Sequence, residues 1–160
     1  MVRWRSGRGH VLSPPPRVAL LYVNDDYGRA FQGLLHGALR EAGASLLYEA
    51  PFLEGEARFR DSRDDIVRTL DEIQPDLLLW IGRFQELVLL RSELRRALPG
   101  LRVLASDAAT EGGTYAGLPE FEGDLMVACV DVTAPRAALR SLATRFESAS
   151  GRQLTDAAAL

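Results

Sequence analysis

Several residue types are scarce in this sequence of 160 residues, and each scarcity excludes a class of chemistry. There is no lysine, so all 19 basic residues are arginines and no mechanism that needs a lysine amine is available. A single cysteine, Cys129, excludes an internal disulfide bond and a cysteine-based zinc site. It falls in an apolar strand-like stretch, where we expect a buried, inert thiol. The two histidines, His10 and His36, have no metal-ligand spacing. We therefore expect no metal and no cofactor.

Long apolar runs and a strong net charge are also missing. No apolar run reaches the length of a transmembrane helix, and the basic start lacks the apolar centre of a signal peptide. The net charge of -3 gives no reason to expect nucleic-acid binding. The apolar fraction of 47% and the charged fraction of 26% are typical of one globular domain.

Both ends of the chain differ from its middle. Residues 1–16 are expected to form a disordered leader or linker, in which Pro14 to Pro16 act as a stiff spacer. Residues 17–160 are expected to form a single lobe. The last residues, "LTDAAAL", are typical of the first turn of a helix, so we expect a lobe that is truncated at its C-terminus.

Two periodicities alternate along residues 17–160. Apolar runs predict strands at 18–23, 45–52, 76–82, 101–106 and 124–132, and a glycine-rich loop is expected over 107–123. Apolar residues at helical spacing follow the first three strands, and another helix is expected over 134–151. This alternation predicts an α/β fold with three layers: an open, mostly parallel sheet of about five strands, with helices on both faces.

In such sheets, ligands bind beyond the carboxyl ends of the strands. This rule selects three loops: 24–28, 82–84 and 106–109. Asp25 and Asp26 in the first loop could hold Mg²⁺, as in a phosphoacceptor receiver domain, or could cap the helix that follows. A receiver also needs an aspartate at 81–83 and a lysine, and both are missing. No glycine-rich phosphate loop and no nucleophile–base set is present, so we expect no enzyme.

Several segments occur in the order and spacing of one known family. These are "RVALLYVNDDYGRAFQGLLHGALREAGASLLYEAPF", "IQPDLLLWIGRFQELVLLRSELR", "RVLASDAAT", "FEGDLMVACV" and "ATRFESASGRQLTDAAAL". Together they resemble the second lobe of type I periplasmic binding proteins. More narrowly, they resemble the branched-chain amino-acid (Leu/Ile/Val) substrate-binding family of ABC transporters. The resemblance covers roughly residues 17–160.

The resemblance implies a cleft between two lobes, with this chain as one wall. The implied ligand-binding residues are Tyr27, Arg83, Phe84, Asp107 and Ala108. Asp107 stands where the family has an acid that pairs with a ligand ammonium. Arg83 replaces an aromatic residue, which favours a ligand with an additional carboxylate. Three alternatives stay open: Arg83 as a solvated residue at a helix start, Tyr27 as a lid over the first helix, and Asp107 as the cap of a short turn.

The resulting hypothesis is a non-enzymatic lobe that binds an amino acid or small carboxylate. It would belong to an ABC-transporter substrate-binding or receptor protein. The implied partners are the first lobe or parent chain and an ABC permease. The family works outside the cytoplasmic membrane, although this chain, expressed as written, would stay in the cytoplasm. A second hypothesis is a domain for association only, for example a homodimer formed through the stripe of Phe31, Leu34 and Leu35.

Overall fold

The computed structural model describes residues 15–110, 117–127, 141, 144, 145, 147, 148 and 151. Cys129, nearly all of the expected leader and most of the expected helix 134–151 lie outside these residues. The strands are β1 (Arg17–Val23), β2 (Ser45–Phe52), β3 (Leu77–Ile81), β4 (Arg102–Ala105) and β5 (Leu125–Met126). They form one sheet in the order β2-β1-β3-β4-β5, and every described pair of neighbours is parallel. This confirms the predicted α/β fold with a five-stranded parallel sheet.

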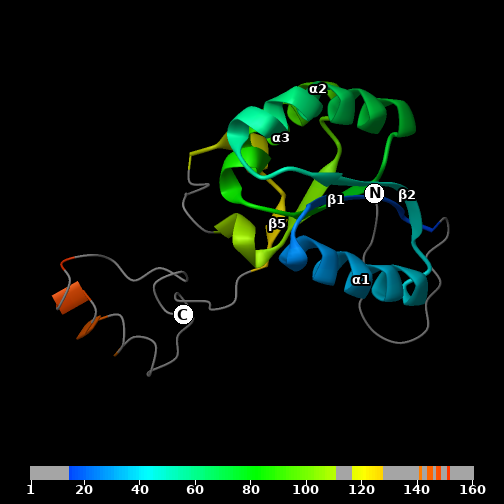
Figure 1. Cartoon of the computed structure of the whole chain (residues 1–160). Coiled ribbons are helices and arrows are strands. Elements are labelled where there is room, and N and C mark those ends of the chain that lie inside the picture. The colour runs from blue at the N-terminus through cyan, green and yellow to red at the C-terminus, as the bar shows by residue number, and fades with distance from the viewer. Residues whose placement is uncertain are drawn as a thin grey trace.

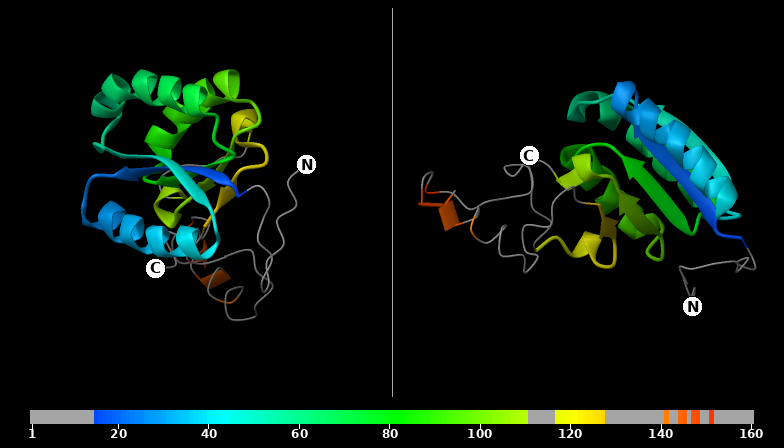
Figure 2. Two further views of the ribbon diagram at one scale, coloured as in Figure 1. Left: turned by 90° about the vertical axis from the view of Figure 1, so that its right-hand side faces the viewer. Right: turned by 90° about the horizontal axis from the view of Figure 1, so that it is seen from below.

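The helices form two layers around this sheet (Figure 1). The helix α1 (Asp26–Glu41) covers one face, and α2 (Glu56–Ile73) and α3 (Phe84–Ala97) lie side by side on the other, as the turned views also show (Figure 2). Strand β1 is followed by a helix on one face, whereas its neighbour β3 is followed by a helix on the opposite face. In α/β proteins, ligands bind at the carboxyl edge of the sheet beside such a switch point.

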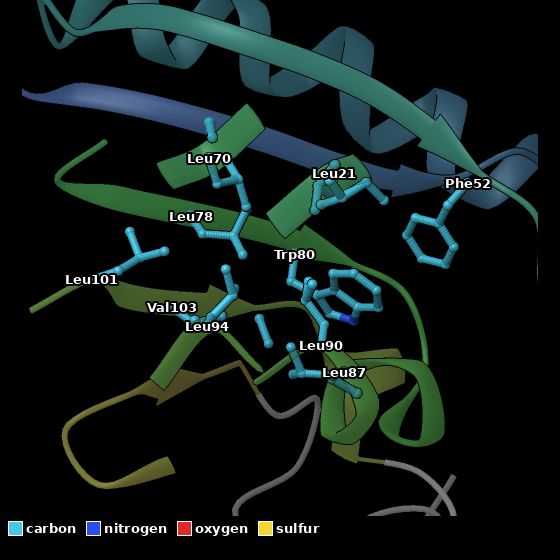
Figure 3. Packing of buried hydrophobic residues seen from close by; sticks show 14 of the residues in the cluster. Leu21, Phe52, Leu70, Leu78, Trp80, Leu87, Leu90, Leu94, Leu101 and Val103 are labelled. Atoms are coloured by element: carbon cyan, nitrogen blue, oxygen red, sulfur yellow. The ribbon is translucent and has the colours of Figure 1, made fainter. Parts of the chain in front are cut away.

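The face covered by α2 and α3 holds most of the core. Trp80 lies at its centre, fully buried among leucines from the strands and from α3 (Figure 3). Phe52 stacks on Trp80 with a centroid distance of 4.5 Å and an interplanar angle of 15°. A Cβ atom on Gly82 would lie 2.5 Å from Cζ of Phe52 and 3.1 Å from the Trp80 ring, so a side chain here would displace the stacked rings.

The start of α1 is fixed against the end of β1. The Asp25 side chain accepts a hydrogen bond of 2.8 Å from the Gly28 N–H, which is a helix N-cap. Asp25 therefore has the capping role considered for the acid pair, and Asp26 is the first residue of the helix. A Cβ atom on Gly28 would lie 1.9 Å from the Val23 carbonyl oxygen, so α1 packs on the strand end by backbone contact.

The region between β4 and β5 differs from the expected glycine-rich loop. It contains two short 3₁₀ helices, η1 (Asp107–Thr110) and η2 (Pro119–Phe121), while residues 111–116 lie outside the described part of the chain. Phe121 and Ala109 are buried in the core on the α2–α3 side. The residues after Val127 in the expected strand 124–132 also lie outside the described part.

Candidate functional site

Two side chains from distant loops meet at the carboxyl edge of the sheet. Tyr27 is the second residue of α1, and Asp107 begins η1 directly after β4. The Tyr27 hydroxyl donates a hydrogen bond of 2.5 Å to Oδ1 of Asp107, across 80 residues of sequence. The Tyr27 ring also packs on Phe31 at a centroid distance of 4.9 Å. The hydrogen bond links the ends of β1 and β4 across the end of β3, which lies between them.

The environment of Tyr27 keeps its hydroxyl protonated. Burial, followed by the hydrogen bond to Asp107, raises the pKa of Tyr27 to about 12. The Ser106 side chain and the Ala108 backbone lie near enough to this hydroxyl to oppose the rise. Tyr27, Asp107 and Ala108, three of the predicted site residues, therefore lie together, and Tyr27 is a hydrogen-bond donor at neutral pH.

The backbone around Asp107 is held in place from both sides. Before it, the Ser106 N–H donates a bond of 2.9 Å to the Trp80 carbonyl, which continues the strand ladder. After it, the Thr110 hydroxyl donates a bond of 2.6 Å to the Asp107 carbonyl. Asp107 is therefore the first residue of a short 3₁₀ turn, and its side chain faces Tyr27. A carboxylate fixed in this way is suited to pairing with a cation.

Arg83 follows β3, the strand that lies between β1 and β4 at this edge. It is the N-cap residue of α3, and its guanidinium forms an ion pair with the Glu54 carboxylate, which follows β2. Phe84, the first residue of α3, is half-buried. Sequence reasoning missed Glu54, although the rule that selected the other three loops also applies to the loop after β2.

A buried carboxylate fixes the loop after β2 to α3. Glu86 lies in the first turn of α3 with only 3% of its surface exposed, and its Oε1 accepts a bond of 2.8 Å from the Gly55 N–H. The Trp80 indole N–H donates a bond of 3.3 Å to the Arg83 carbonyl. These bonds determine where Glu54 and Arg83 can lie.

A second ion pair that the sequence analysis missed joins α3 to the start of β5. Arg91 of α3 and Asp124, just before β5, form an ion pair with side chains 0% and 1% exposed. The Arg91 Nε–Asp124 Oδ2 distance is 2.6 Å, and the guanidinium also donates to the Leu101 carbonyl at 3.1 Å. Burial raises the pKa of the Asp124 carboxyl above its ordinary value, and Arg91 opposes this rise. The pair attaches the start of β5 to α3 and has a structural role.

The described residues contain no group of three or more histidine, cysteine, aspartate or glutamate side chains that could hold a metal ion. Within the same part of the chain, no helix combines the length and apolar character needed to cross a membrane. The site consists of hydrogen-bonding and charged groups at the end of a sheet. Such groups suit the recognition of a small polar molecule.

No protein-family model matches the sequence, and no curated protein sequence is similar to it. The structure is similar to that of the leucine-binding protein LivK from Thermotoga maritima, with a TM-score of 0.72 and 18% identity over 86% of this chain and 39% of that one. A benzoate complex of an ABC-transporter solute-binding protein from R. palustris has a TM-score of 0.71 and 11% identity, over 88% and 38% of the two chains. A putative branched-chain amino acid ABC transporter protein from Rhodospirillum rubrum has a TM-score of 0.70 and 19% identity, over 89% and 40%.

These similarities establish the fold. The chain has the fold of a partial lobe of type I periplasmic binding proteins, as the sequence resemblance predicted. It spans about 40% of the length of LivK and of the other two proteins. The compared proteins are solute-binding proteins.

Proposed function

We propose that this chain is a non-enzymatic binding lobe for a small molecule that carries an amino group. The observation that carries the proposal is the Tyr27–Asp107 hydrogen bond at the carboxyl edge of the sheet. It fixes a carboxylate at the place where α/β sheets bind ligands, and a ligand ammonium is the natural partner of such a carboxylate. The proposed ligand is an amino acid or a closely related amine-bearing carboxylate.

The structural neighbours support a binding role without selecting the ligand. They include a leucine-binding protein and a benzoate complex, and of these two ligands only leucine carries an amino group. The choice of an amine therefore depends on Asp107 of this chain. Since the chain spans about 40% of these proteins, we propose that a further lobe supplies the other wall of the cleft. The assembled protein would act outside the cytoplasmic membrane and deliver its ligand to an ABC permease.

Nuclear magnetic resonance titration of the full chain tests the proposal. Leucine and 4-methylpentanoate share the same carbon skeleton, and only leucine carries the amine. We expect leucine to shift the amide signals of residues 27, 107 and 108 with weak affinity, because one wall buries only part of a ligand. Asp107→Asn should remove this response, whereas the control Asp26→Asn, on the exposed first turn of α1, should keep it. Equal responses to both compounds, or binding that survives Asp107→Asn, would contradict the proposal.

A second candidate function, association through α1, is favoured by one observation. Leu34 of α1 is 72% exposed, and its neighbours Phe31 and Leu35 are only half-buried. Pairing of two α1 helices would remove this apolar surface from water. Light scattering tests it: a dimer that Leu34→Asp converts into a monomer supports association, and a monomeric wild-type chain contradicts it.

A further inference from the structure

Three contacts join the end of β2 and the loop after it, residues 52–55, to the end of β3 and the start of α3, residues 80–86. Phe52 at the end of β2 stacks on Trp80 of β3 at 4.5 Å. The buried Glu86 carboxylate accepts the Gly55 N–H at 2.8 Å. The Glu54 carboxylate pairs with the Arg83 guanidinium. Glu54 is therefore held in place by its neighbours in the sequence: Phe52 packs on Trp80, and Gly55 is hydrogen-bonded to Glu86.

These contacts keep Glu54 and Arg83 close together at the carboxyl edge of the sheet. The two side chains are 49% and 48% exposed, so both remain accessible from solvent. The guanidinium cation is balanced by a carboxylate of the same chain. A ligand carboxylate that approaches Arg83 must compete with Glu54 and meets its negative charge. Glu86, also acidic, lies one helical turn beyond Arg83.

We propose that Glu54 is a specificity-determining residue of the binding lobe. It compensates Arg83 and so selects against ligands with a second carboxylate, in favour of amino acids with an uncharged side chain. This inference rests on the proposed function and deepens it. It also reverses the expectation from the sequence, in which Arg83 favoured an additional carboxylate on the ligand. The difference arises because Glu54 lies 29 residues before Arg83 and its approach depends on the fold.

Glutamine and glutamate test this inference, because they have nearly the same shape and differ in the second carboxylate. Both are titrated into the full chain and followed by nuclear magnetic resonance. We expect the wild-type chain to bind glutamine more tightly than glutamate. Glu54→Gln should raise the affinity for glutamate relative to glutamine by about two- to fivefold. This is the range expected for an ion pair whose side chains are partly exposed. Adding Arg83→Ala to Glu54→Gln should remove this gain, because Arg83 is the group that Glu54 compensates.

Glu56→Gln is the matched control. Glu56 is exposed in the first turn of α2, two residues from Glu54, and pairs with Arg60 at 3.7 Å. The substitution Glu56→Gln removes the same charge without a contact to Arg83, so the ratio of the affinities for glutamate and glutamine should stay at the wild-type value. Far-ultraviolet circular dichroism checks that each variant is folded.

The outcomes separate this inference from the proposed function. A wild-type chain that binds no amino acid overturns both. Binding of amino acids with an unchanged glutamate-to-glutamine ratio in Glu54→Gln overturns only the role of Glu54. An equal change in Glu56→Gln also overturns it, because it would show a general effect of charge.

Discussion

The two faces of the sheet are stabilised very differently. The face under α2 and α3 buries Trp80, Phe59 and a continuous set of leucines, with the buried Arg91–Asp124 pair at one end. Among the residues that the structure describes, the buried cluster on the other face consists of Val18, Leu20, Leu79 and Ile81, and Gly28 is the single buried residue of α1. The α1 face nevertheless supplies Tyr27 to the site. Regions with few buried contacts open at low free-energy cost. The fold thus combines a densely packed half with a half that has fewer buried contacts, which we expect to open at a lower free-energy cost.

The largest expected effect comes from breaking the buried Arg91–Asp124 ion pair on the α2–α3 side. Arg91→Ala should lower the free energy of unfolding by about 3–5 kcal/mol, because Asp124 would stay buried without its partner. Urea unfolding measures this change. Arg96→Ala, on the exposed surface of the same helix, is the control and should change the stability by less than about 0.5 kcal/mol. A small loss in Arg91→Ala would show that β5 is attached by other contacts. The double variant Arg91→Met/Asp124→Leu should recover much of the loss.

A matched pair of leucines compares the two faces directly. Leu90→Ala removes a fully buried side chain from the α3 side and should cost about 2–5 kcal/mol of unfolding free energy. Leu34→Ala removes the same atoms from the exposed surface of α1 and should change stability by less than about 0.5 kcal/mol. Chemical denaturation of both variants gives the difference. Similar losses at both positions would mean that the α1 side is as tightly packed as the α3 side.

The smallest expected effect concerns the Tyr27–Asp107 bond and appears as a titration. The pKa of Tyr27 is raised to about 12, so its contribution to stability is complete below about pH 10 and is lost as pH rises toward 12. Asp107→Asn should lower this pKa, because the carboxylate that favours the neutral phenol is removed. Ultraviolet absorbance of tyrosinate follows the change, and the difference from Tyr27→Phe identifies the residue. An unchanged titration in Asp107→Asn would contradict the hydrogen bond.

The sequence was sufficient to predict the order of β1 to β5 and of the helices α1 to α3 between them. Continuous apolar runs mark β1 and β3 because parallel strands are buried on both faces. It also indicated the three loops that contain Tyr27, Arg83 and Asp107, because strand ends converge at one edge of a parallel sheet. The contact between Tyr27 and Asp107 could not be predicted from the sequence. It depends on the strand order that places β1 and β4 on either side of β3, and this order is a property of the whole sheet.

The partners in the two ion pairs could not be predicted from the sequence. Arg91 lies on the same helical stripe as Leu87, Leu94 and Leu98, and this pattern indicates a buried arginine. The pattern does not identify its partner, because the 22 acidic residues of the chain are all candidates until the loop before β5 is placed. Glu54 and Arg83 present the same problem. Each lies at a strand end, and only the attachment of the loop after β2 to α3 brings them together.

Gly82 limits which substitutions the carboxyl edge of the sheet can accept. Any side chain at position 82 would push Phe52 away from Trp80 and open the junction on which Glu54 and Arg83 depend. Substitutions at positions 54, 83 and 84 leave that junction in place. A library that varies these three positions and keeps Gly82 constant would therefore test the proposed ligand selectivity on an intact scaffold, whereas side chains at position 82 are expected to lower the stability.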